Sequence, residues 1–377
     1  MTHDIMQDWI AAFQPRALAA GIRPATLDQA LTGLSLRDDV LEKERSQAEF
    51  TRTIWDYLDR AVSAERIAAG RAALETHGDI VGRIAAHYGV DPQIVVAIWG
   101  LESNFGTLRG DVPTIAALAT LAATNRRGAY FESELLAALQ ILQAGDVTAG
   151  QMMGSWAGAM GHTQFMPSNY LTLAVDFDGD GRRDIWAEDP TDALASTAAY
   201  LARWGWQAGK PWGVEITLPH GFDYLLAGER EQKPAAEWQA LGVCRAGGGD
   251  LAEAGPTRVL LPAGALGAAF LIYPNFHVIE HYNRADAYVL AVGHLGDRIL
   301  GGGPIVTPWP RDLRALTRDE CVALQNRLTQ AGFDTGGADG RIGPRTQSAL
   351  RAFQTASGLA PDGFASLAIL RHLGGQA

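Results

Sequence analysis

Residues 90–106 read V-D-P-Q-I-V-V-A-I-W-G-L-E-S-N-F-G, and this stretch predicts a buried helix that ends beside a single acidic residue. Asp91 followed by Pro92 is typical of a helix start, because Asp caps a first turn and Pro fits its first position. Asn104 and Gly106 are residues that commonly end a helix. The positions between are apolar on nearly every face, so the helix should lie in a hydrophobic core.

Glu102 is the charged residue of this helix, and it falls in the last turn, beyond Ile98 and Trp99. Burial disfavours its anion, and so does the negative end of the helix dipole. Both effects favour a protonated carboxylic acid, which can donate a proton near neutral pH. The alternative is that the carboxylate reaches solvent at the helix end and has no chemical role.

Residues 150–170 break the helical pattern with closely spaced small residues. The glycines are Gly150, Gly154, Gly158 and Gly161. Glycines weaken a helix, so they indicate that something approaches the backbone closely. Hydrogen-bonding side chains lie among them, namely Ser155, His162, Thr163 and Gln164. A polymer of sugars fits such a surface, because it offers hydroxyls, amides and faces for stacking; the alternative is close packing of the protein on itself.

Residues 176–186, D-F-D-G-D-G-R-R-D-I-W, resemble the start of a calcium loop. The matching positions are Asp176, Asp178, Asp180 and Gly181, and Arg182 in the seventh place completes the candidate metal-binding set. The twelfth place is Ala187 instead of Glu, so a closing carboxylate would come from Glu188, Asp189 or Asp192. We expect a structural calcium or sodium ion here; the alternative is a solvated acidic turn.

Composition limits the function classes of this 377-residue chain. Hydrophobic residues make up 47% and charged residues 19%, which is typical of a globular protein. The net charge of −11 argues against a nucleic-acid partner. Two cysteines, Cys244 and Cys321, are too few and too far apart for a disulfide framework. The N-terminus lacks a basic segment followed by an apolar one, so either the protein is cytoplasmic or an export signal has been removed.

The chain order predicts a mainly α (α+β) protein. Amphipathic helices are predicted over residues 4–85, and two more helices over Ile115–Leu121 and Tyr130–Leu142 are separated by the polar turn Asn125–Gly128. Short apolar runs between Gly and Pro residues predict a β-rich insertion over 206–275. The runs are Val214–Leu218, Val259–Leu261 and Phe270–Ile272. Helix resumes near residue 286, and a Gly- and Pro-rich linker follows over 301–310.

Residues 311–373 predict a separate three-helix module. It opens with a capping box, Thr317 to Glu320, and contains two related turns, Asp339-Gly340 and Asp362-Gly363, that each precede a short helix. Residues 311–377 carry eight Arg and six acidic residues, a balance of +2 in an acidic protein.

Three blocks in order make the chain resemble a known family: A-I-W-G-L-E-S-N-F-G, S-W-A-G-A-M-G-H-T-Q-F-M-P-S and H-Y-N-R-A-D-A-Y. The chain is similar to the membrane-bound lytic murein transglycosylase B family of bacterial cell-wall lyases, followed by a peptidoglycan-binding module, over most of residues 35–373. The resemblance implies a lysozyme-like catalytic domain, formed by 1–205 with 276–300, and a peptidoglycan-binding module at 311–373.

The resemblance also implies roles for particular residues. Glu102 matches the catalytic glutamate. The substrate-binding positions would be Ser155, Gln164, Tyr282, Asn283 and Tyr288. Asn283 could instead cap the helix that follows it. Asp192 falls where the family has the distal acid of its cation loop, although a short insertion precedes it. Trp55 or Tyr57 would also line the cleft.

The implied activity is that of a carbon–oxygen lyase that cleaves the β-1,4 bond between N-acetylmuramic acid and N-acetylglucosamine and leaves a 1,6-anhydro-N-acetylmuramic acid end. Glu102 would be its sole acid and base, and no cofactor would take part in catalysis. The implied partners are peptidoglycan glycan strands and, as a further possibility, other cell-wall enzymes. We expect a monomer. The implied location is periplasmic or outer-membrane-associated, in a bacterium.

Two rival functions remain open from the sequence. A lysozyme-type hydrolase needs a second carboxylate about 5–10 Å from Glu102, and Asp111 is the nearest acid along the chain after it. A non-catalytic wall-binding protein could keep the same fold, although intact Glu102, Ser155 and Gln164 argue against it. We further expect the C-terminal module to act as a tethered attachment device that raises the local glycan concentration.

Overall fold

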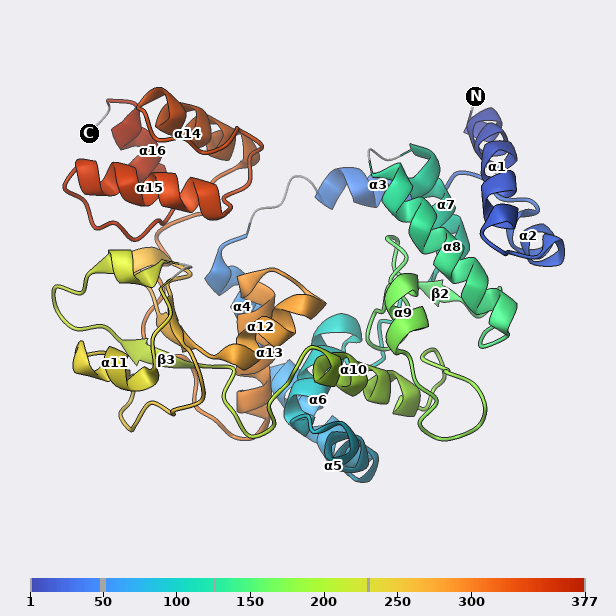
Figure 1. The fold of residues 1–377 in the computed structure, drawn as a ribbon, viewed down its shortest axis with the longest axis horizontal. Coiled ribbons are helices and arrows are strands. Elements are labelled where there is room, and N and C mark those ends of the chain that lie inside the picture. Colours follow the sequence, from blue (N-terminus) through green and yellow to red (C-terminus); the bar gives the residue numbers. More distant parts are fainter. Residues whose placement is uncertain (1, 48–51, 125–126, 229–230, 376–377) are drawn as a thin grey trace. The chain divides into compact units, whose positions relative to one another are not determined.

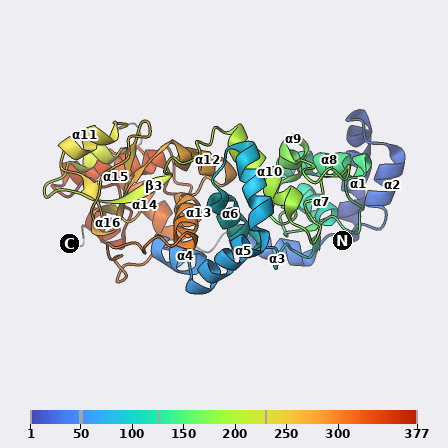
Figure 2. The same cartoon turned by 90° about the horizontal axis from the view of Figure 1, so that it is seen from below.

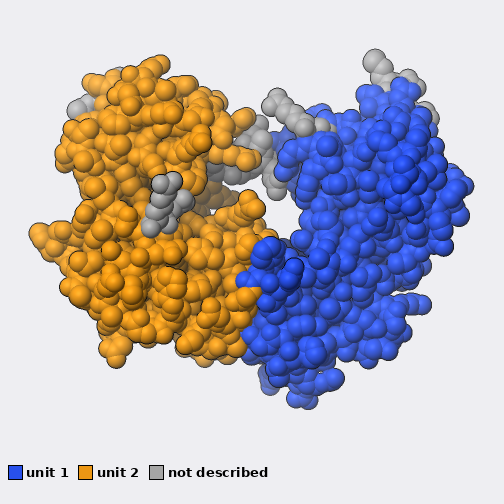
Figure 3. Space-filling view, viewed as in Figure 1, with its two compact units in different colours: residues 1–48, 65–204 blue, residues 49–64, 205–377 orange. Residues whose placement is uncertain are grey.

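The computed structural model is mainly helical, as the sequence predicts (Figure 1). It describes residues 2–47, 52–124, 127–228 and 231–375. Asn125 and Arg126, in the predicted polar turn, lie outside these described residues. The chain divides into two compact units: unit 1 comprises residues 1–48 and 65–204, and unit 2 comprises 49–64 and 205–377 (Figure 3). This division groups residues 276–300 with the β-rich insertion and the C-terminal module.

Unit 1 is mainly helical. The helices are α1 (Thr2–Ala19), α2 (Pro24–Leu31), α3 (Asp38–Gln47), α5 (Ala64–Tyr88), α6 (Pro92–Ser103), α7 (Thr114–Thr124), α8 (Gly128–Ala144), α9 (Pro167–Leu173) and α10 (Thr191–Arg203). Helices α7 and α8 lie side by side in both views of the ribbon (Figures 1 and 2). Two short strands, β1 (Val112–Pro113) and β2 (Met153–Gly154), pair antiparallel.

Helix α6 confirms the prediction made from residues 90–106. Asp91 occupies the N-cap position, Pro92 opens the helix, and Asn104 ends it in the left-handed conformation with φ of 50°. Val95, among other residues of this helix, is fully buried. The apolar sequence therefore places α6 in the core, and Glu102 in its last turn is carried to the edge of that core.

Unit 2 contains a four-stranded antiparallel sheet in the order β4-β3-β6-β5. The strands are β3 (Gly213–Thr217), β4 (Cys244–Arg245), β5 (Arg258–Leu260) and β6 (Ala269–Ile272), which confirms the three predicted apolar runs. The helices of this unit before the module are α4 (Ile54–Ala61), η1 (Tyr224–Ala227), α11 (Ala235–Ala240), η2 (Gly264–Leu266), α12 (Pro274–Tyr282) and α13 (Asp286–Ile299). Trp238 and Tyr273 are buried in the hydrophobic core beside the sheet.

The C-terminal module has its own hydrophobic core. Its helices are α14 (Arg318–Gln330), α15 (Pro344–Ala356) and α16 (Leu367–Leu373), and they bury Leu324, Leu350 and Phe353 between them. Both hydrogen bonds of the predicted capping box are present at the start of α14. The sequence therefore predicts this module well, including the turns that precede α15 and α16.

The segment 301–310, predicted as a linker, is held by specific contacts within unit 2. The Glu215 carboxylate on β3 accepts hydrogen bonds from the backbone N–H groups of Val306 and Thr307, both at 2.7 Å. The Trp309 ring lies 6.3 Å from that of Trp55 on α4. Arg311 then forms a two-pronged ion pair with Asp59. The contacts combine backbone hydrogen bonds, aromatic packing and an ion pair. In a flexible linker these groups would face solvent.

No described helix combines the length and apolarity that crossing a bilayer requires.

Candidate active site

Glu102 lies half-buried in the last turn of α6, one turn beyond the buried residues Ile98 and Trp99. The C-terminal end of a helix presents backbone carbonyl groups and a negative partial charge, which disfavour a nearby anion. Glu102 therefore lies where the sequence predicts it, at the end of the buried helix.

The wall beside Glu102 is fixed by hydrogen bonds between the end of α6 and His162. Ser103, the next residue, is buried; its hydroxyl donates to the His162 carbonyl at 2.6 Å and accepts from the N–H of Gly106 at 2.9 Å. The Trp99 indole donates to Nδ1 of His162 at 3.1 Å, and Nε2 of His162 lies 2.7 Å from the Ala187 carbonyl. Burial lowers the pKa of His162, so the ring is neutral here, with its proton on Nε2.

Gln164 connects the loop after α6 to the glycine-rich segment. Its Nε2 donates to the carbonyls of Arg109 and Gly161, both at 2.9 Å. Gln164 has a φ of 54°, a left-handed conformation that a non-glycine residue adopts only when its surroundings hold it there. Both amide protons of Gln164 are therefore engaged by the protein, and its remaining carbonyl oxygen is the group that can accept from a ligand.

Ser155 follows β2 directly, and the pairing of β2 with β1 fixes it close in the fold to the loop that leaves α6. Its hydroxyl accepts a hydrogen bond from the N–H of Ala159 at 3.0 Å. That bond uses a lone pair and leaves the hydroxyl proton available as a donor.

The predicted glycines mainly accommodate the protein itself. A Cβ at Gly154 would lie 2.2 Å from the Ala159 carbonyl oxygen, and one at Gly161 would lie 2.4 Å from that of Ile185. Gly158, with φ of +88°, packs against Leu118 in the same way. At these positions the structure favours close packing, one of the two alternatives left open by the sequence, as the reason for the small residues.

Tyr282, Asn283 and Tyr288 lie in unit 2, at the junction of α12 and α13. Asn283 ends α12, and its Oδ1 accepts from the N–H of Ala285 at 3.1 Å. The N-cap of α13 is Ala285, so the alternative in which Asn283 caps that helix is wrong. The rings of Tyr282 and Tyr288 are stacked, with centroids 6.5 Å apart and planes 8° apart, and Tyr288 is buried. The stacking fixes the turn that presents Asn283.

The acidic loop brings three of the predicted carboxylates together. One oxygen from each of Asp176, Asp178 and Asp192 can be chosen so that all lie within 4.8 Å of one another. Asp192 supplies the closing carboxylate, while Glu188 pairs with Arg109 and Asp189 accepts hydrogen bonds from Thr191. Asp180 lies outside this group of three.

Asp180 and Arg182 are instead joined to each other, because the N–H of Arg182 donates to Asp180 Oδ1 at 2.8 Å. Asp192 lies in the first turn of α10 with an exposed fraction of 3%, and it accepts from the N–H groups of Phe177 and Asp184. Burial raises the pKa of Asp192 to about 6, and the charge of Asp178 adds to the effect. The donor set is therefore all oxygen with clustered negative charge, which suits a hard cation.

Sequence reasoning missed Arg109 and Ser103. Arg109 donates to the carbonyls of Trp186 and Ala187, both at 2.9 Å, and so attaches the loop after α6 to the segment behind the acidic loop. A lone Arg in a polar loop gives no periodic signal, and its acceptors lie about eighty residues away. Ser103 was overlooked because its partner is a backbone carbonyl, which no side-chain pattern reveals.

Comparison with known proteins assigns both parts of the chain. A family described as "Transglycosylase SLT domain" matches residues 5–297, and one described as "Putative peptidoglycan binding domain" matches residues 317–373. A curated relative, the membrane-bound lytic murein transglycosylase B of Escherichia coli (strain K12), is 32% identical over 256 residues. That alignment covers 64% of this chain and 66% of the relative.

Solved structures agree with this assignment. SltB3 from Pseudomonas aeruginosa, in complex with NAG-anhNAM-pentapeptide, is 48% identical with a TM-score of 0.95, and the match covers 98% of this chain and 99% of that one. The lytic transglycosylase Slt35 of Escherichia coli, in complex with calcium, is 29% identical with a TM-score of 0.66 over 79% of this chain and 93% of that one. With an acid at the end of a buried helix, a hydrogen-bonded glycine-rich wall and these matches, the chain belongs to the transglycosylase SLT family, the peptidoglycan lytic transglycosylases, and ends in a peptidoglycan-binding module.

Proposed function

We propose that the chain cleaves the β-1,4 bond between N-acetylmuramic acid and N-acetylglucosamine, with Glu102 as the sole acid and base, and leaves a 1,6-anhydro-N-acetylmuramic acid end. The observation that carries this proposal is the position of Glu102, half-buried at the carbonyl end of a core helix. A carboxyl group there can hold the proton that a glycosidic oxygen needs as it departs.

In the first step Glu102 donates its proton to the glycosidic oxygen, and the C1–O bond breaks as an oxocarbenium-like centre develops on the muramic acid. In the second step the 6-hydroxyl of the same sugar attacks C1, and the Glu102 carboxylate takes the hydroxyl proton. The nucleophile is tethered to the reacting carbon, which gives it a high effective concentration. The step therefore needs neither an enzyme nucleophile nor a catalytic water.

The predicted substrate-binding residues carry groups that would complement an acetamido sugar. The Ser155 hydroxyl and the Asn283 amide can donate, because the bonds from Ala159 and Ala285 use only their oxygens as acceptors. Gln164 can accept, because both its protons are held by backbone carbonyls. An acetamido group needs one donor for its carbonyl and one acceptor for its N–H, so this set suits the acetamido sugars of the glycan.

The similar protein SltB3 was crystallised with NAG-anhNAM-pentapeptide, a fragment that carries the anhydro sugar, which supports this product. A hydrolase would need a second carboxylate near Glu102. The candidate Asp111 is exposed, and its charge acts on Arg37, raising the pKa of that guanidinium together with Asp39.

Mass spectrometry of the products from purified peptidoglycan tests the proposal. Digestion in ¹⁸O-labelled water should give anhydro-muropeptides without the label. Labelled reducing ends would instead establish hydrolysis.

We also propose that a structural calcium or sodium ion binds Asp176, Asp178 and Asp192, with the Arg182 carbonyl as a further ligand. A cation would offset the charge of three clustered carboxylates, one of them buried. Slt35 was crystallised with calcium, which supports the choice of a hard cation. The ion would stabilise the loop before α10 and take no part in proton transfer. As a cell-wall enzyme, the protein would work in the periplasm or at the outer membrane, as a monomer.

A further inference from the structure

The C-terminal module contains the same turn twice, held by the same set of hydrogen bonds. In the first turn, Gln325 on α14 donates to Asp339 Oδ1 at 3.0 Å and accepts from the N–H of Gly340 at 2.8 Å. In the second, Gln354 on α15 donates to Asp362 Oδ1 at 2.7 Å and accepts from the N–H of Gly363 at 2.8 Å. The two turns are therefore structural repeats.

The likeness extends to the rest of each turn. Asp339 Oδ1 accepts from the N–H of Arg341 at 2.9 Å, and Asp362 Oδ1 accepts from that of Phe364 at 2.9 Å. The two glycines have φ of 78° and 75°. In both turns Oδ1 of the aspartate is used inside the turn, which directs Oδ2 outward.

The second turn uses its outward oxygen to bind a backbone amide. Asp362 Oδ2 accepts a hydrogen bond from the N–H of Ala265 at 2.9 Å, in the η2 segment of the β-rich insertion. A Cβ at Gly264 would lie 2.5 Å from the same oxygen, so the segment packs directly against the carboxylate. One copy of the repeat thus already acts as a receptor for peptide backbone.

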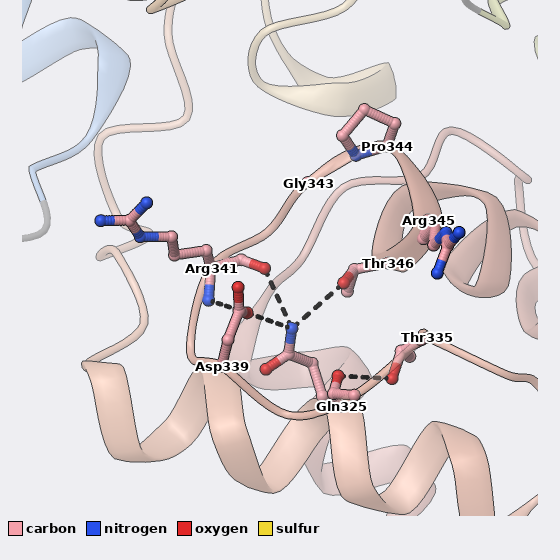
Figure 4. Close-up of a pocket in the computed structure, with 10 residues that line it drawn as sticks. Gln325, Thr335, Asp339, Arg341, Gly343, Pro344, Arg345 and Thr346 are labelled. Carbon is pink, nitrogen blue, oxygen red and sulfur yellow. Dashed lines mark hydrogen bonds between the residues drawn. The ribbon is translucent and has the colours of Figure 1, made fainter. Parts of the chain in front are cut away.

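The first turn faces a hollow. Among the described residues, none donates a hydrogen bond to Asp339 Oδ2. The turn borders an open cavity of about 560 Å³ whose polar lining includes the buried side chains of Gln325, Thr335 and Thr346. Figure 4 shows Gln325 at the centre of the hydrogen bonds that hold this wall, with its amide directed at Asp339, Thr346 and the Arg341 carbonyl.

Two arginines give the hollow a positive rim. Arg341 and Arg345 lie on either side of it in Figure 4, and both are exposed. Neither forms a salt bridge within the described part of the chain. Arg345 packs along Gly336, whose missing side chain leaves room for it, because a Cβ there would lie 2.8 Å from the Arg345 guanidinium. Guanidinium groups held at such a rim are suited to bind carboxylates.

We propose that this hollow binds the stem peptide of peptidoglycan, with Asp339 Oδ2 accepting a backbone N–H and Arg345, assisted by Arg341, binding a carboxylate of the peptide. The pairing of one amide acceptor with flanking guanidinium groups matches a peptide that carries free carboxylates better than it matches a neutral glycan. This assignment rests on the proposed function, since it gives the peptidoglycan-binding module the peptide part of the same polymer as its ligand.

Binding of a sugar-free synthetic stem pentapeptide to the full-length chain, measured by calorimetry, tests the assignment. Asp339→Asn keeps Oδ1, and so the turn, but replaces the outward acceptor with a donor. Arg345→Gln removes the charge at the rim. Each variant should weaken peptide binding about tenfold, which is about 1.4 kcal/mol. Arg371→Gln removes an exposed arginine of α16 outside the hollow and should change the affinity less than twofold.

Three outcomes would overturn the assignment: a wild-type chain that does not bind the pentapeptide, variants that bind it as the wild type does, or a wild-type chain that prefers peptide-free glycan. Peptide binding needs no turnover, so any of these would leave the proposed reaction intact. A failure to form anhydro ends would instead refute the reaction and leave the binding data standing.

Discussion

Two carboxylates of unit 1 lie at opposite ends of helices, and their surroundings differ accordingly. Glu102 belongs to the last turn of α6, where carbonyl groups point outward, and Asp192 belongs to the first turn of α10, where its oxygens accept two backbone N–H groups. The carbonyl end of α6 favours a carboxyl group that keeps its proton. At Asp192 the two backbone N–H donors favour the anion, whereas burial and the charge of Asp178 raise its pKa, so a bound cation would offset that cost. The two helix ends therefore surround these carboxylates with partial charges of opposite sign.

The largest effect should come from Glu102→Gln, which tests the first half of the comparison. The amide keeps the volume of the side chain but cannot exchange a proton, so kcat should fall at least about 100-fold, or about 2.7 kcal/mol in the barrier. The measurement is release of anhydro-muropeptides, with circular dichroism to show an intact fold. Glu75→Gln, an exposed position on α5, is the control and should keep wild-type activity. Residual turnover above a few per cent in the Glu102 variant would move the chemistry elsewhere.

Chelation and Asp178→Ala test whether the carboxylates around Asp192 hold a structural cation. A ligand present at about 100 times its Kd stabilises a fold by about 2.7 kcal/mol, so removing the cation should lower Tm by about 5 to 10 °C. Asp178→Ala should lower Tm similarly and abolish the response to chelator. Asp180→Asn, outside the group of three carboxylates, should keep that response. Unchanged Tm in both chelated wild type and Asp178→Ala would reduce the loop to an acidic turn.

Asp362→Asn tests a carboxylate of unit 2 that accepts a hydrogen bond from the Ala265 N–H. The substitution puts an amide where an acceptor is needed, and losing this bond should destabilise unit 2 by about 1–2 kcal/mol. Thermal unfolding should show a lower Tm, and limited proteolysis should cut faster within residues 301–310. The repeat provides a matched control, because Asp339→Asn alters the equivalent oxygen where no described donor binds it. Equal losses of Tm in the two variants would contradict the docking role of Asp362.

The smallest effect concerns His162, the neutral group behind the end of α6. Its pKa is lowered by burial, and Trp99 donates to its Nδ1, so a second ring proton has no acceptor in the fold. The sign follows from linkage: this contribution to stability is complete above the ordinary His pKa of about 6.5 and is lost as the pH falls below it. Urea unfolding at pH 7.5 and 5.5 should show lower stability in acid, and His162→Gln should reduce the difference. His220→Gln, at an exposed position, should keep it.

The sequence predicted what depends on local pattern. The apolar run before Glu102 predicts the burial of α6, the stop signals after it place its acid in the last turn, and the capping box predicts α14. Other features depend on distant partners. Asp192 joins Asp176 and Asp178 because the first turn of α10 lies beside the acidic loop. Gly154 and Gly161 are small because the carbonyls of Ala159 and Ile185 lie against them in the folded chain.

The docked segment 301–310 has a mechanical consequence. A slack chain of ten residues could extend by up to about 35 Å before it carried any load. In this protein the segment is held at Glu215, Trp55 and Asp59, so no such slack separates the module from strand β3 and helix α4. Tension from a stretched cell wall on the module would therefore be transmitted at once to the body of unit 2, which also carries Asn283.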